Sequence, residues 1–483
     1  MLPDHQTCYR AISAKDTRFD GRLFTGVITT GIYCRPICPA RLPKSTNVQF
    51  YVSAAAAHEA GFRACLRCRP ETAPDTPAWR GTSATIGRAF RLIEEGGLDD
   101  HSVAHLALRL GIGDRQLRRL FHKHVGASPI AVAQTRRILL AKQLLHQTQL
   151  PMVQIALAAG FGSVRRFNEV FQQLFNRPPT QLRRGLEADF AVHSGSEIWL
   201  QLPFRQPYDW EGVAQFLKNR LYENIETFEG DTYCRSFSID GIEGIVRVRP
   251  GGISWLDVGV TCQNLAVLPK VISNVRAAFD LAADPSAIGA HLSLDSTLAP
   301  LIAQRPGLRV PSSWAGFEGV VRAILGQQIT VKAAIALGNH LVKALGSPLS
   351  SGLGQNARIT QVFPQPYDVA QADLSFMPMP KSRQLTLNLV AQLFVDRADI
   401  LDGETEKTCD HLSTIPGIGP WTLDYIKLRV LRDPDALPAS DVALIRAMSA
   451  LSSVKSSSPH LTTCGEAWRP WRSYAAQYLW ASL

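Results

Sequence analysis

The chain has 483 residues, of which 46% are apolar and 19% are charged, with a formal net charge of +10. This composition excludes a disordered chain, and at about 100–200 residues per domain the length predicts two to four domains. No apolar stretch approaches the roughly 20 residues of a membrane span, and the first residues lack the pattern of a secretion signal. We therefore expect a cytoplasmic protein without a membrane partner.

The basic residues are concentrated in the first two-fifths of the chain. Residues 1–190 contain 26 lysines and arginines and 14 acidic residues, whereas the remainder contains 25 basic and 27 acidic residues. The excess favours a polyanionic partner for the N-terminal region. A solvated basic surface explains the charge alone equally well.

Four of the nine cysteines form two close pairs, Cys34 with Cys38 and Cys65 with Cys68. Four thiolates in two pairs are typical of tetrahedral Zn²⁺ coordination, most often in a purely structural role. An odd total in a chain that is not secreted argues against a disulfide framework. The other five cysteines are scattered: Cys8, Cys234, Cys262, Cys409 and Cys464.

The residues around the quartet, Thr29–Pro36 and Gly61–Cys68, resemble the N-terminal domain of Ada-type methylphosphotriester repair proteins. The resemblance implies that Cys34 is the methyl acceptor and that Cys38, Cys65 and Cys68 are plain zinc ligands. Methylation would change the formal charge of the site from −2 to −1, which favours an approach to DNA phosphates. The arginines beside the cysteines are candidates for steering the DNA backbone: Arg35, Arg63 and Arg67.

Two polar stretches, Glu71–Pro77 and Val192–Ser196, have the composition of linkers, and an internal repeat lies between them. Residues 106–129 and 155–179 each predict a helix, a glycine turn and a second helix, followed by Gly126 in one copy and Asn176 in the other. Glycine and asparagine both end helices in the left-handed conformation. The repeat therefore predicts two helix-turn-helix units.

The second helix of each unit carries a polar, basic face whose arginine, glutamine and asparagine side chains suit the edges of bases in a major groove. The alternative is a helical hairpin with solvated arginines. The doubled arrangement resembles the AraC-type regulators over Ser83–Arg184 and implies DNA binding. The predicted DNA-reading residues are Arg115, Gln116, Arg118, Arg119, Arg165, Arg166 and Asn168.

In the C-terminal region, Ile415–Thr422 contains Gly417 and Gly419 and predicts a tight hairpin whose backbone N–H groups can bind a phosphate. Pro420 suits the first turn of the helix that follows, where its missing N–H costs nothing. Asp441 follows 22 residues after Gly419. This spacing resembles the helix-hairpin-helix DNA glycosylases. Further motifs resemble the AlkA-type 3-methyladenine DNA glycosylase II over Glu197–Leu483: Gln206–Trp210, Arg305–Arg309, Phe317–Gln327 and Trp468–Ala475.

The glycosylase resemblance implies a base pocket in which aromatic rings stack on a cationic, alkylated purine while Asp441 stabilises the sugar cation. The alternatives are that the rings belong to the core and that Asp441 caps a helix. Trp421 stands where glycosylases that also cut the strand carry a lysine, so we expect a monofunctional enzyme. The predicted pocket residues are Phe216, Gln327, Gln328, Trp421, Tyr425 and Trp480. Gln328 replaces the leucine that wedges into the base stack in this family.

Together these features predict a multidomain, mainly α protein with α+β parts. The expected domains are a zinc-binding α/β domain (1–76), a double helix-turn-helix (80–188), an antiparallel-sheet part of the glycosylase (197–313) and its helical part (314–483). Expected partners are damaged and promoter DNA, with RNA polymerase as a further candidate, and a monomer is the default. The chain has no Pro-Cys-His-Arg element, so no O6-alkylguanine methyltransferase activity is predicted. The alternatives are a regulator with an inactive glycosylase fold and an active glycosylase with a purely structural zinc site.

Overall fold

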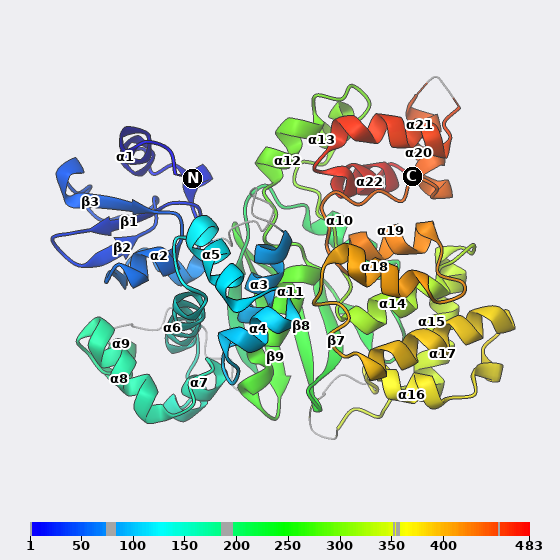
Figure 1. Ribbon diagram of the computed structural model, residues 1–483, viewed down its shortest axis with the longest axis horizontal. Coiled ribbons are helices and arrows are strands. Elements are labelled where there is room, and N and C mark those ends of the chain that lie inside the picture. Colours follow the sequence, from blue (N-terminus) through cyan, green and yellow to red (C-terminus); the bar gives the residue numbers. More distant parts are fainter. Residues whose placement is uncertain (1, 74–83, 185–196, 351–352, 354–357, 453–454) are drawn as a thin grey trace. The chain divides into compact units, whose positions relative to one another are not determined.

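The computed structural model describes residues 2–73, 84–184, 197–350, 353, 358–452 and 455–483 (Figure 1). The chain forms two compact units. The first comprises Met1–Pro203, Asp257–Gly259 and Asn264–Ser273, and the second comprises Phe204–Leu256, Val260–Gln263 and Asn274–Leu483. Most of the first predicted linker (residues 74–77) and all of the second (192–196) lie outside the described residues.

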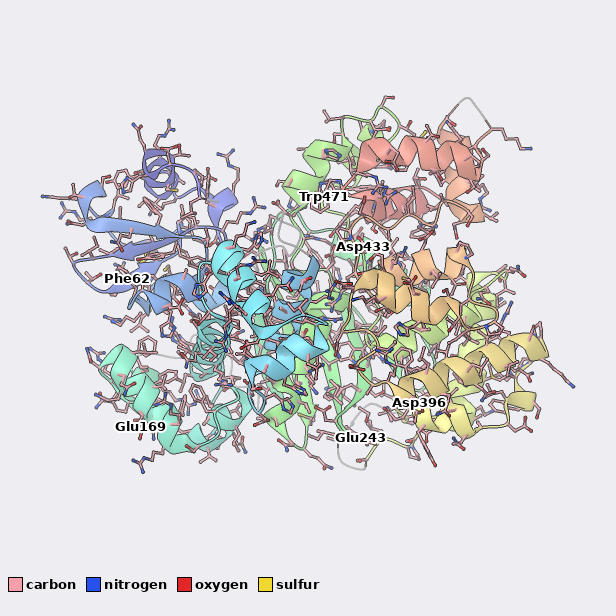
Figure 2. The ribbon with its side chains drawn as sticks, viewed as in Figure 1. Phe62, Glu169, Glu243, Asp396, Asp433 and Trp471 are labelled. Carbon is pink, nitrogen blue, oxygen red and sulfur yellow. The ribbon has the colours of Figure 1, made fainter. Side chains whose placement is uncertain are left out.

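The N-terminal part of the first unit is a small α/β domain around a four-stranded sheet of order β3-β1-β2-β4. The central strand β1 runs antiparallel to both β2 and β3, whereas β2 and β4 are parallel. Phe62, labelled in Figure 2, belongs to the core of this domain together with Tyr33. The elements are α1 (His5–Ser13), β1 (Phe24–Val27), β2 (Ile32–Cys34), β3 (Val48–Tyr51), α2 (Ala54–Glu59) and β4 (Arg63–Ala64).

The rest of the first unit contains the predicted pair of helix-turn-helix units, α4–α5 and α7–α8, joined by the long helix α6. As predicted, the second helix of each copy ends in the left-handed conformation, at Gly126 (φ 71°) and at Asn176 (φ 51°). The helices are α3 (Ala84–Glu94), α4 (Val103–Arg109), α5 (Asp114–Val125), α6 (Pro129–Gln147), α7 (Met152–Ala158), α8 (Val164–Phe175) and α9 (Pro179–Arg184).

The N-terminal α/β domain and the first helix-turn-helix share one hydrophobic core. Ala55 and Ala56 of α2 pack in the same buried cluster as Phe121 of α5. Polar contacts reinforce this packing, because the Ser53 hydroxyl donates to the Val125 carbonyl at 2.9 Å and the Ser128 hydroxyl donates to the Glu59 carboxylate at 2.8 Å. The two parts therefore form one structural body.

A five-stranded sheet of order β5-β9-β8-β7-β6 lies between the helix-turn-helix units and the C-terminal helices in the sequence. Strands β6, β7 and β8 pair antiparallel through tight turns, with Gly230 and Gly241 at positive φ. The strands are β5 (Ile198–Pro203), β6 (Glu226–Glu229), β7 (Thr232–Ile239), β8 (Ile242–Gly252) and β9 (Trp255–Cys262), and the helices are α10 (Trp210–Lys218), α11 (Leu268–Ala278), α12 (Pro285–Leu292) and α13 (Ala299–Gln304).

Helices make up most of the C-terminal part. A buried apolar cluster of this part is built on α14, which is buried along most of its length, and includes Val320, Leu387 and Ile426. No described helix is both long and apolar enough to cross a bilayer. The helices are α14 (Gly316–Leu325), α15 (Val331–Leu345), α16 (Pro366–Gln371), α17 (Lys381–Asp396), α18 (Thr405–Ser413), α19 (Pro420–Arg429), α20 (Val442–Leu451), α21 (Ser458–Gly465) and α22 (Arg472–Ala481).

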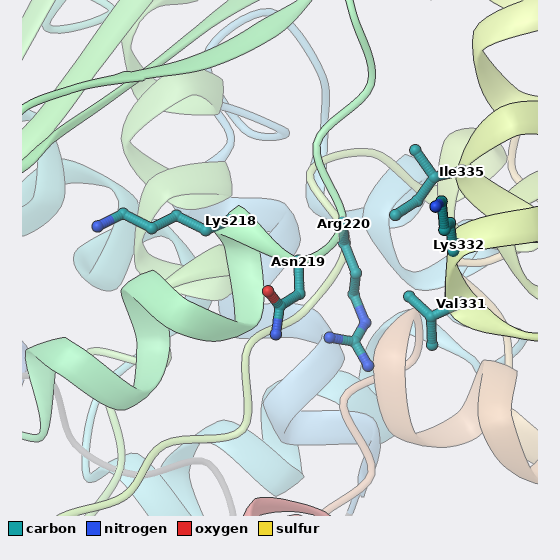
Figure 3. A pocket seen from close by; sticks show the side chains of 6 residues that line it. All are labelled: Lys218, Asn219, Arg220, Val331, Lys332 and Ile335. Atoms are coloured by element: carbon teal, nitrogen blue, oxygen red, sulfur yellow. The ribbon is translucent and has the colours of Figure 1, made fainter.

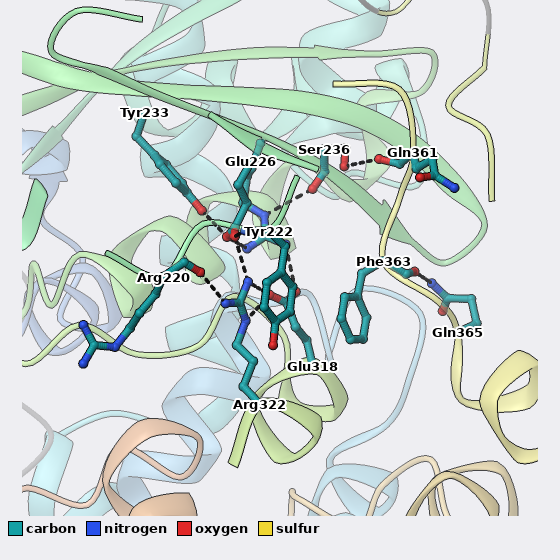
Figure 4. A network of polar contacts seen from close by, with 11 residues as sticks. Arg220, Tyr222, Glu226, Tyr233, Ser236, Glu318, Arg322, Gln361, Phe363 and Gln365 are labelled. Atoms are coloured by element: carbon teal, nitrogen blue, oxygen red, sulfur yellow. Dashed lines mark hydrogen bonds and ion pairs between the residues drawn. The ribbon is translucent and has the colours of Figure 1, made fainter. Parts of the chain in front are cut away.

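A buried charged network joins the five-stranded sheet to α14 (Figure 4). Glu226 lies 3.2 Å from Arg235 and 2.7 Å from Arg322, and Glu318 lies 2.8 Å from both arginines. The Tyr233 hydroxyl also donates to Glu226 at 2.7 Å. Because two carboxylates face two guanidinium groups, each buried charge is compensated. The network therefore fixes β6, β7 and α14 to one another.

Candidate functional sites

The four predicted zinc ligands come together in space. The sulfur atoms of Cys34, Cys38, Cys65 and Cys68 all lie within 4.8 Å of one another, close enough for all four to bind one ion. Cys65 and Cys68 are buried, whereas Cys34 and Cys38 are partly exposed. Two backbone N–H groups donate to the cluster, from Arg35 to Cys68 at 3.3 Å and from Arg67 to Cys65 at 3.4 Å. Four thiolates with such donors fit Zn²⁺.

Arg35 supports the cluster from within the protein instead of facing DNA. Its side chain is 10% exposed and forms an ion pair with Asp20. It also donates to the Cys68 carbonyl at 3.2 Å and to the Thr72 hydroxyl at 2.7 Å. The expectation that Arg35 steers the DNA backbone is therefore wrong, because its guanidinium is already occupied.

A buried ion pair holds the second cysteine pair against α6. The Lys142 ammonium lies 2.7 Å from the Glu71 carboxylate, and both side chains are 1% exposed. The same ammonium donates to the Cys65 carbonyl at 2.8 Å. Burial acts to raise the pKa of Glu71, but the charge of Lys142, its hydrogen bond to the carboxylate and the neighbouring His146 together outweigh burial and hold that pKa below its usual range. No local sequence pattern indicates this pair, since its members lie 71 positions apart.

Every predicted DNA-reading side chain is exposed on α5 or α8. The two helices differ in how their arginines are paired. On α8, Glu169 (labelled in Figure 2) lies 2.9 Å from Arg165 and 3.8 Å from Arg166. On α5, Arg118 pairs with Asp114 at 3.0 Å, whereas Arg115 and Arg119 have no ion-pair partner among the described residues. The positive charge is therefore less compensated on α5.

The predicted hairpin joins α18 to α19. Gly417 has a φ of 90°, and a side chain there would meet the Thr386 hydroxyl at 2.3 Å, so both the backbone and the space require glycine. The Thr386 hydroxyl donates to the Pro416 carbonyl at 2.7 Å. Gly419 is the N-cap of α19 and Pro420 its first residue, as predicted. The space beside Gly419 is open, because a β-carbon there would meet no atom within 4 Å.

Asp441 lies at the N-terminus of α20, where two indole N–H groups converge on its carboxylate. Trp421 donates to Oδ2 at 3.0 Å, and Trp480 donates to Oδ1 at 3.1 Å. Oδ1 also accepts from the Leu444 backbone at 3.0 Å, so the residue does cap its helix. The aromatic wall is continuous, since Trp421 stacks on Tyr425 with centroids 5.3 Å apart and Tyr425 meets Trp480 edge-on at 6.4 Å. The fold thus brings together four residues predicted from the sequence.

Phe216 is joined to this wall by Arg429, which sequence reasoning missed. The Arg429 guanidinium lies 4.4 Å from the centroid of the Phe216 ring and 5.2 Å from that of Trp480. It donates to the Pro311 carbonyl and to Gln477, each at 2.7 Å. Burial lowers the pKa of Arg429 to about 10, so the side chain remains protonated at neutral pH. In the sequence, only the position of Arg429 two helical turns beyond Trp421 indicates that it lies near the pocket.

The two predicted pocket glutamines behave differently. The Gln327 amide donates to the Gly417 carbonyl at 2.8 Å and to the Thr422 hydroxyl at 2.9 Å, so it ties the loop after α14 to the hairpin. Gln328 is exposed and has a φ of 55°, a conformation that non-glycine residues rarely adopt. Ile329 beside it is 37% exposed. The loop therefore presents one strained polar and one apolar side chain.

Comparison with known proteins divides the chain into the same parts as the sequence and the structure do. Residues 7–71 match the metal-binding domain of Ada, residues 106–185 match a helix-turn-helix domain, and residues 199–315 match the AlkA N-terminal domain. A metal-binding domain, a helix-turn-helix pair and a glycosylase region together define a class of proteins that combine regulation with DNA repair.

The full chain aligns at 38% identity with the probable bifunctional transcriptional activator/DNA repair enzyme AlkA of Mycobacterium tuberculosis, covering 100% of this chain and 97% of that protein. This chain belongs to that family of bifunctional activator and repair enzymes. DNA-3-methyladenine glycosylase 2 of Escherichia coli is 28% identical over 58% of this chain and 95% of its own length. The structure of a 3-methyladenine DNA glycosylase from Archaeoglobus fulgidus superposes with a TM-score of 0.53 at 19% identity, covering 58% of this chain and 97% of that one. The likeness to the last protein shows the fold alone.

Proposed function

We propose that the second unit is a monofunctional DNA glycosylase that removes alkylated purines of the 3-methyladenine type from duplex DNA. The observation that carries the proposal is the Asp441 carboxylate held by the indole N–H groups of Trp421 and Trp480 at 3.0 and 3.1 Å. A carboxylate among aromatic rings that serve only as core would cost folding free energy. A pocket for a cationic base beside a developing sugar cation needs both.

In the proposed reaction, the flipped alkylated base stacks against Trp421 and Tyr425. The bond between C1′ and the base nitrogen breaks, and the base leaves with the electron pair, which neutralises its positive charge. Asp441 stabilises the positive charge that develops on the sugar. A water molecule then forms the new C1′–O bond and releases a proton. The backbone around Gly417 and Gly419 would hold a phosphate of the DNA.

The test is base release from duplex DNA treated with a methylating agent, with Asp441→Asn as the comparison. We expect release of 3-methyladenine or 7-methylguanine by the native chain and a loss on the order of 10²–10³-fold or more in the variant. The Asn variant keeps one oxygen, which at the Oδ1 position still accepts from Trp480 and from the Leu444 backbone, so the helix cap is preserved and only the indole of Trp421 loses its acceptor. If neither protein releases an alkylated base while both bind DNA, the second unit is an inactive DNA-binding fold and the protein is a regulator.

For the first unit, we infer that Cys34 accepts a methyl group from a DNA methylphosphotriester. The sulfur of Cys34 forms a bond to the methyl carbon, and the phosphodiester leaves with the electrons of the broken C–O bond. Zn²⁺, when bound, keeps the four cysteines in the thiolate form. The partial exposure of Cys34 supports this role because an acceptor must be reachable. The loss of one negative charge would strengthen the grip of α5 and α8 on promoter DNA in the cytoplasm.

A purely structural zinc site is the second candidate, favoured by the burial of Cys65 and Cys68 and by the hydrogen bonds that Lys142 and Arg35 donate to their carbonyls. Mass spectrometry after incubation with methylated DNA separates the two. We expect one S-methylcysteine at Cys34 and none in Cys34→Ser. Methylation at Cys38, which is also partly exposed, would make Cys38 the acceptor. No methylation at any cysteine would support the structural role. Recruitment of RNA polymerase stays a prediction from the family resemblance.

A further inference from the structure

A groove in the second unit is lined by cationic and amide side chains that the proposed reaction does not use (Figure 3). It encloses about 470 Å³ between the end of α10 and the start of α15. None of its six lining side chains is acidic: Lys218, Asn219, Arg220, Val331, Lys332 and Ile335. From this groove we infer a second DNA contact, a site for a backbone phosphate next to the nucleotide that enters the base pocket. The inference rests on the proposed glycosylase function.

The charges of the groove are uncompensated. Lys218, Arg220 and Lys332 have no ion-pair partner among the residues that the structure describes. Lys332 and Asn219 are exposed, and the Asn219 amide group keeps its N–H donors free because only its oxygen is used, accepting from Gln215 at 2.9 Å. The first turn of α15 adds N–H groups that have no partner within the helix. Such a set of donors and cations fits a phosphate diester.

The floor of the groove is held rigidly. The Arg220 carbonyl accepts from Arg322 at 2.8 Å, and Arg322 belongs to the buried charged network on Glu226 and Glu318. On the other side, α15 begins directly after the loop that Gln327 ties to the hairpin. Both walls are therefore fixed before DNA binds, as a site that positions a substrate requires.

The groove also adjoins the base pocket. The Arg220 guanidinium lies 4.0 Å from the centroid of the Phe216 ring, and Phe216 reaches Trp480 through Arg429. One ring and one guanidinium thus separate the groove from the wall beside Asp441. A flipped nucleotide keeps both of its phosphates at the pocket mouth, so a cationic groove at this distance would bind the adjoining backbone.

Lys218 contributes less than its position suggests. Its ammonium lies 5.0 Å from the centroid of Phe228, and in Figure 3 its side chain points away from Arg220 and Lys332. The binding residues are therefore Asn219, Arg220 and Lys332. Of these, Lys332 and Asn219 are suitable for substitution because neither contacts the aromatic wall.

The experiment measures how strongly the full chain prefers a short duplex with one abasic-site analogue over excess undamaged duplex that occupies the helix-turn-helix units. We expect Lys332→Gln to weaken this preference about three- to tenfold and to lower the salt dependence by about one ion. Asn219→Asp should weaken it further, and Asn219→Lys should strengthen it, a gain that damage to the fold cannot produce. Lys343→Gln, an exposed lysine in the last turn of the same helix, is the matched control.

Replacing single phosphates near the lesion by neutral methylphosphonates locates the contact. At the phosphate bound by the groove, neutralisation should remove the difference between the native chain and Lys332→Gln. Unchanged preference in Lys332→Gln and in both Asn219 variants overturns the site. Because binding requires no turnover, a chain that prefers the abasic duplex but releases no base overturns the glycosylase proposal alone. A chain that releases base but shows the same preference in every groove variant overturns the groove alone.

Discussion

The cysteine cluster and the Asp441 pocket are assembled in different ways. The cluster takes its four sulfur atoms from residues 34–68, and its second pair is held by one buried lysine. The pocket takes its walls from α19, α20 and α22 and from α10, which lies about 200 residues earlier in the sequence. The first site therefore depends on its ion and on two ion pairs, Arg35 with Asp20 and Lys142 with Glu71, whereas the second depends on the packing of several helices.

Removal of a zinc ligand should give the largest difference between the effects on the two sites. Cys65→Ser is expected to lose bound zinc and all methyl acceptance, because a three-thiolate site binds the ion far less tightly and ligand loss is coupled to local unfolding. Base release should stay within about twofold of the native rate, a factor that corresponds to no lost interaction in the second unit. Zinc content and base release are measured on the same preparation. A parallel loss of base release would show that the sites are not independent.

Breaking the buried pair tests the support of the cluster. Glu71→Gln leaves the Lys142 ammonium buried without its counter-charge, which should destabilise the first unit by about 3–5 kcal/mol. Urea unfolding followed by a probe in each unit would measure this. Glu59→Gln, at an exposed contact with Ser128, is the control and should cost about 1 kcal/mol or less. If both variants lower the free energy of unfolding by the same amount, the buried pair stabilises the first unit no more than the exposed contact does.

In the pocket, the corresponding support is the Gln327 amide. Gln327→Leu keeps the volume of the side chain and removes both donors to Gly417 and Thr422. We expect kcat/KM for base release to fall about tenfold, from the loss of roughly 1–2 kcal/mol in holding the loop to the hairpin. Zinc content and methyl acceptance should not change. An unaltered kcat/KM would mean that the loop needs no such anchor.

The smallest expected effect is that acid acts on the two units in opposite directions. Burial lowers the pKa of His146 in the first unit to about 4 from an ordinary value of 6.5, so its contribution to stability is lost as pH falls through that range. Burial raises the pKa of Asp280 in the second unit to about 6 from 3.8, so that unit gains stability as pH falls toward 4. Between pH 7 and 5 each contribution is on the order of 1–2 kcal/mol. His146→Gln and Asp280→Asn should each flatten the pH dependence of their own unit.

The same contrast decides what could be predicted from the sequence. The cysteine cluster, the left-handed residues Gly126 and Asn176 and the proline at the start of α19 follow from local spacing and backbone chemistry, and the structure confirms them. The resemblance to a glycosylase pointed to Asp441 and its aromatic neighbours, which the fold brings together. Their catalytic roles stay predictions.

What sequence reasoning missed is the choice of partners over long distances. Nothing in the local pattern indicates that Arg35 pairs with Asp20 or that Lys142 pairs with Glu71. The same holds for Arg429, whose guanidinium meets Phe216 only after α10 and α19 have packed. A charged side chain looks solvated in a sequence until the tertiary fold buries it. For that reason the resemblance to Ada-type proteins suggested DNA as the partner of Arg35, which instead pairs with Asp20.

The shared core of α2 and the first helix-turn-helix has a consequence for how such proteins arise by gene fusion. Because Ala55 and Ala56 complete the packing around Phe121, a cut between residues 73 and 84 would expose apolar surface on both sides. The smallest piece that can be exchanged between proteins therefore extends from the N-terminal helix through the first helix-turn-helix and α6, which carries Lys142. Recombination that moved the zinc-binding domain alone would deliver an incomplete fold, so sensor and DNA reader are inherited together.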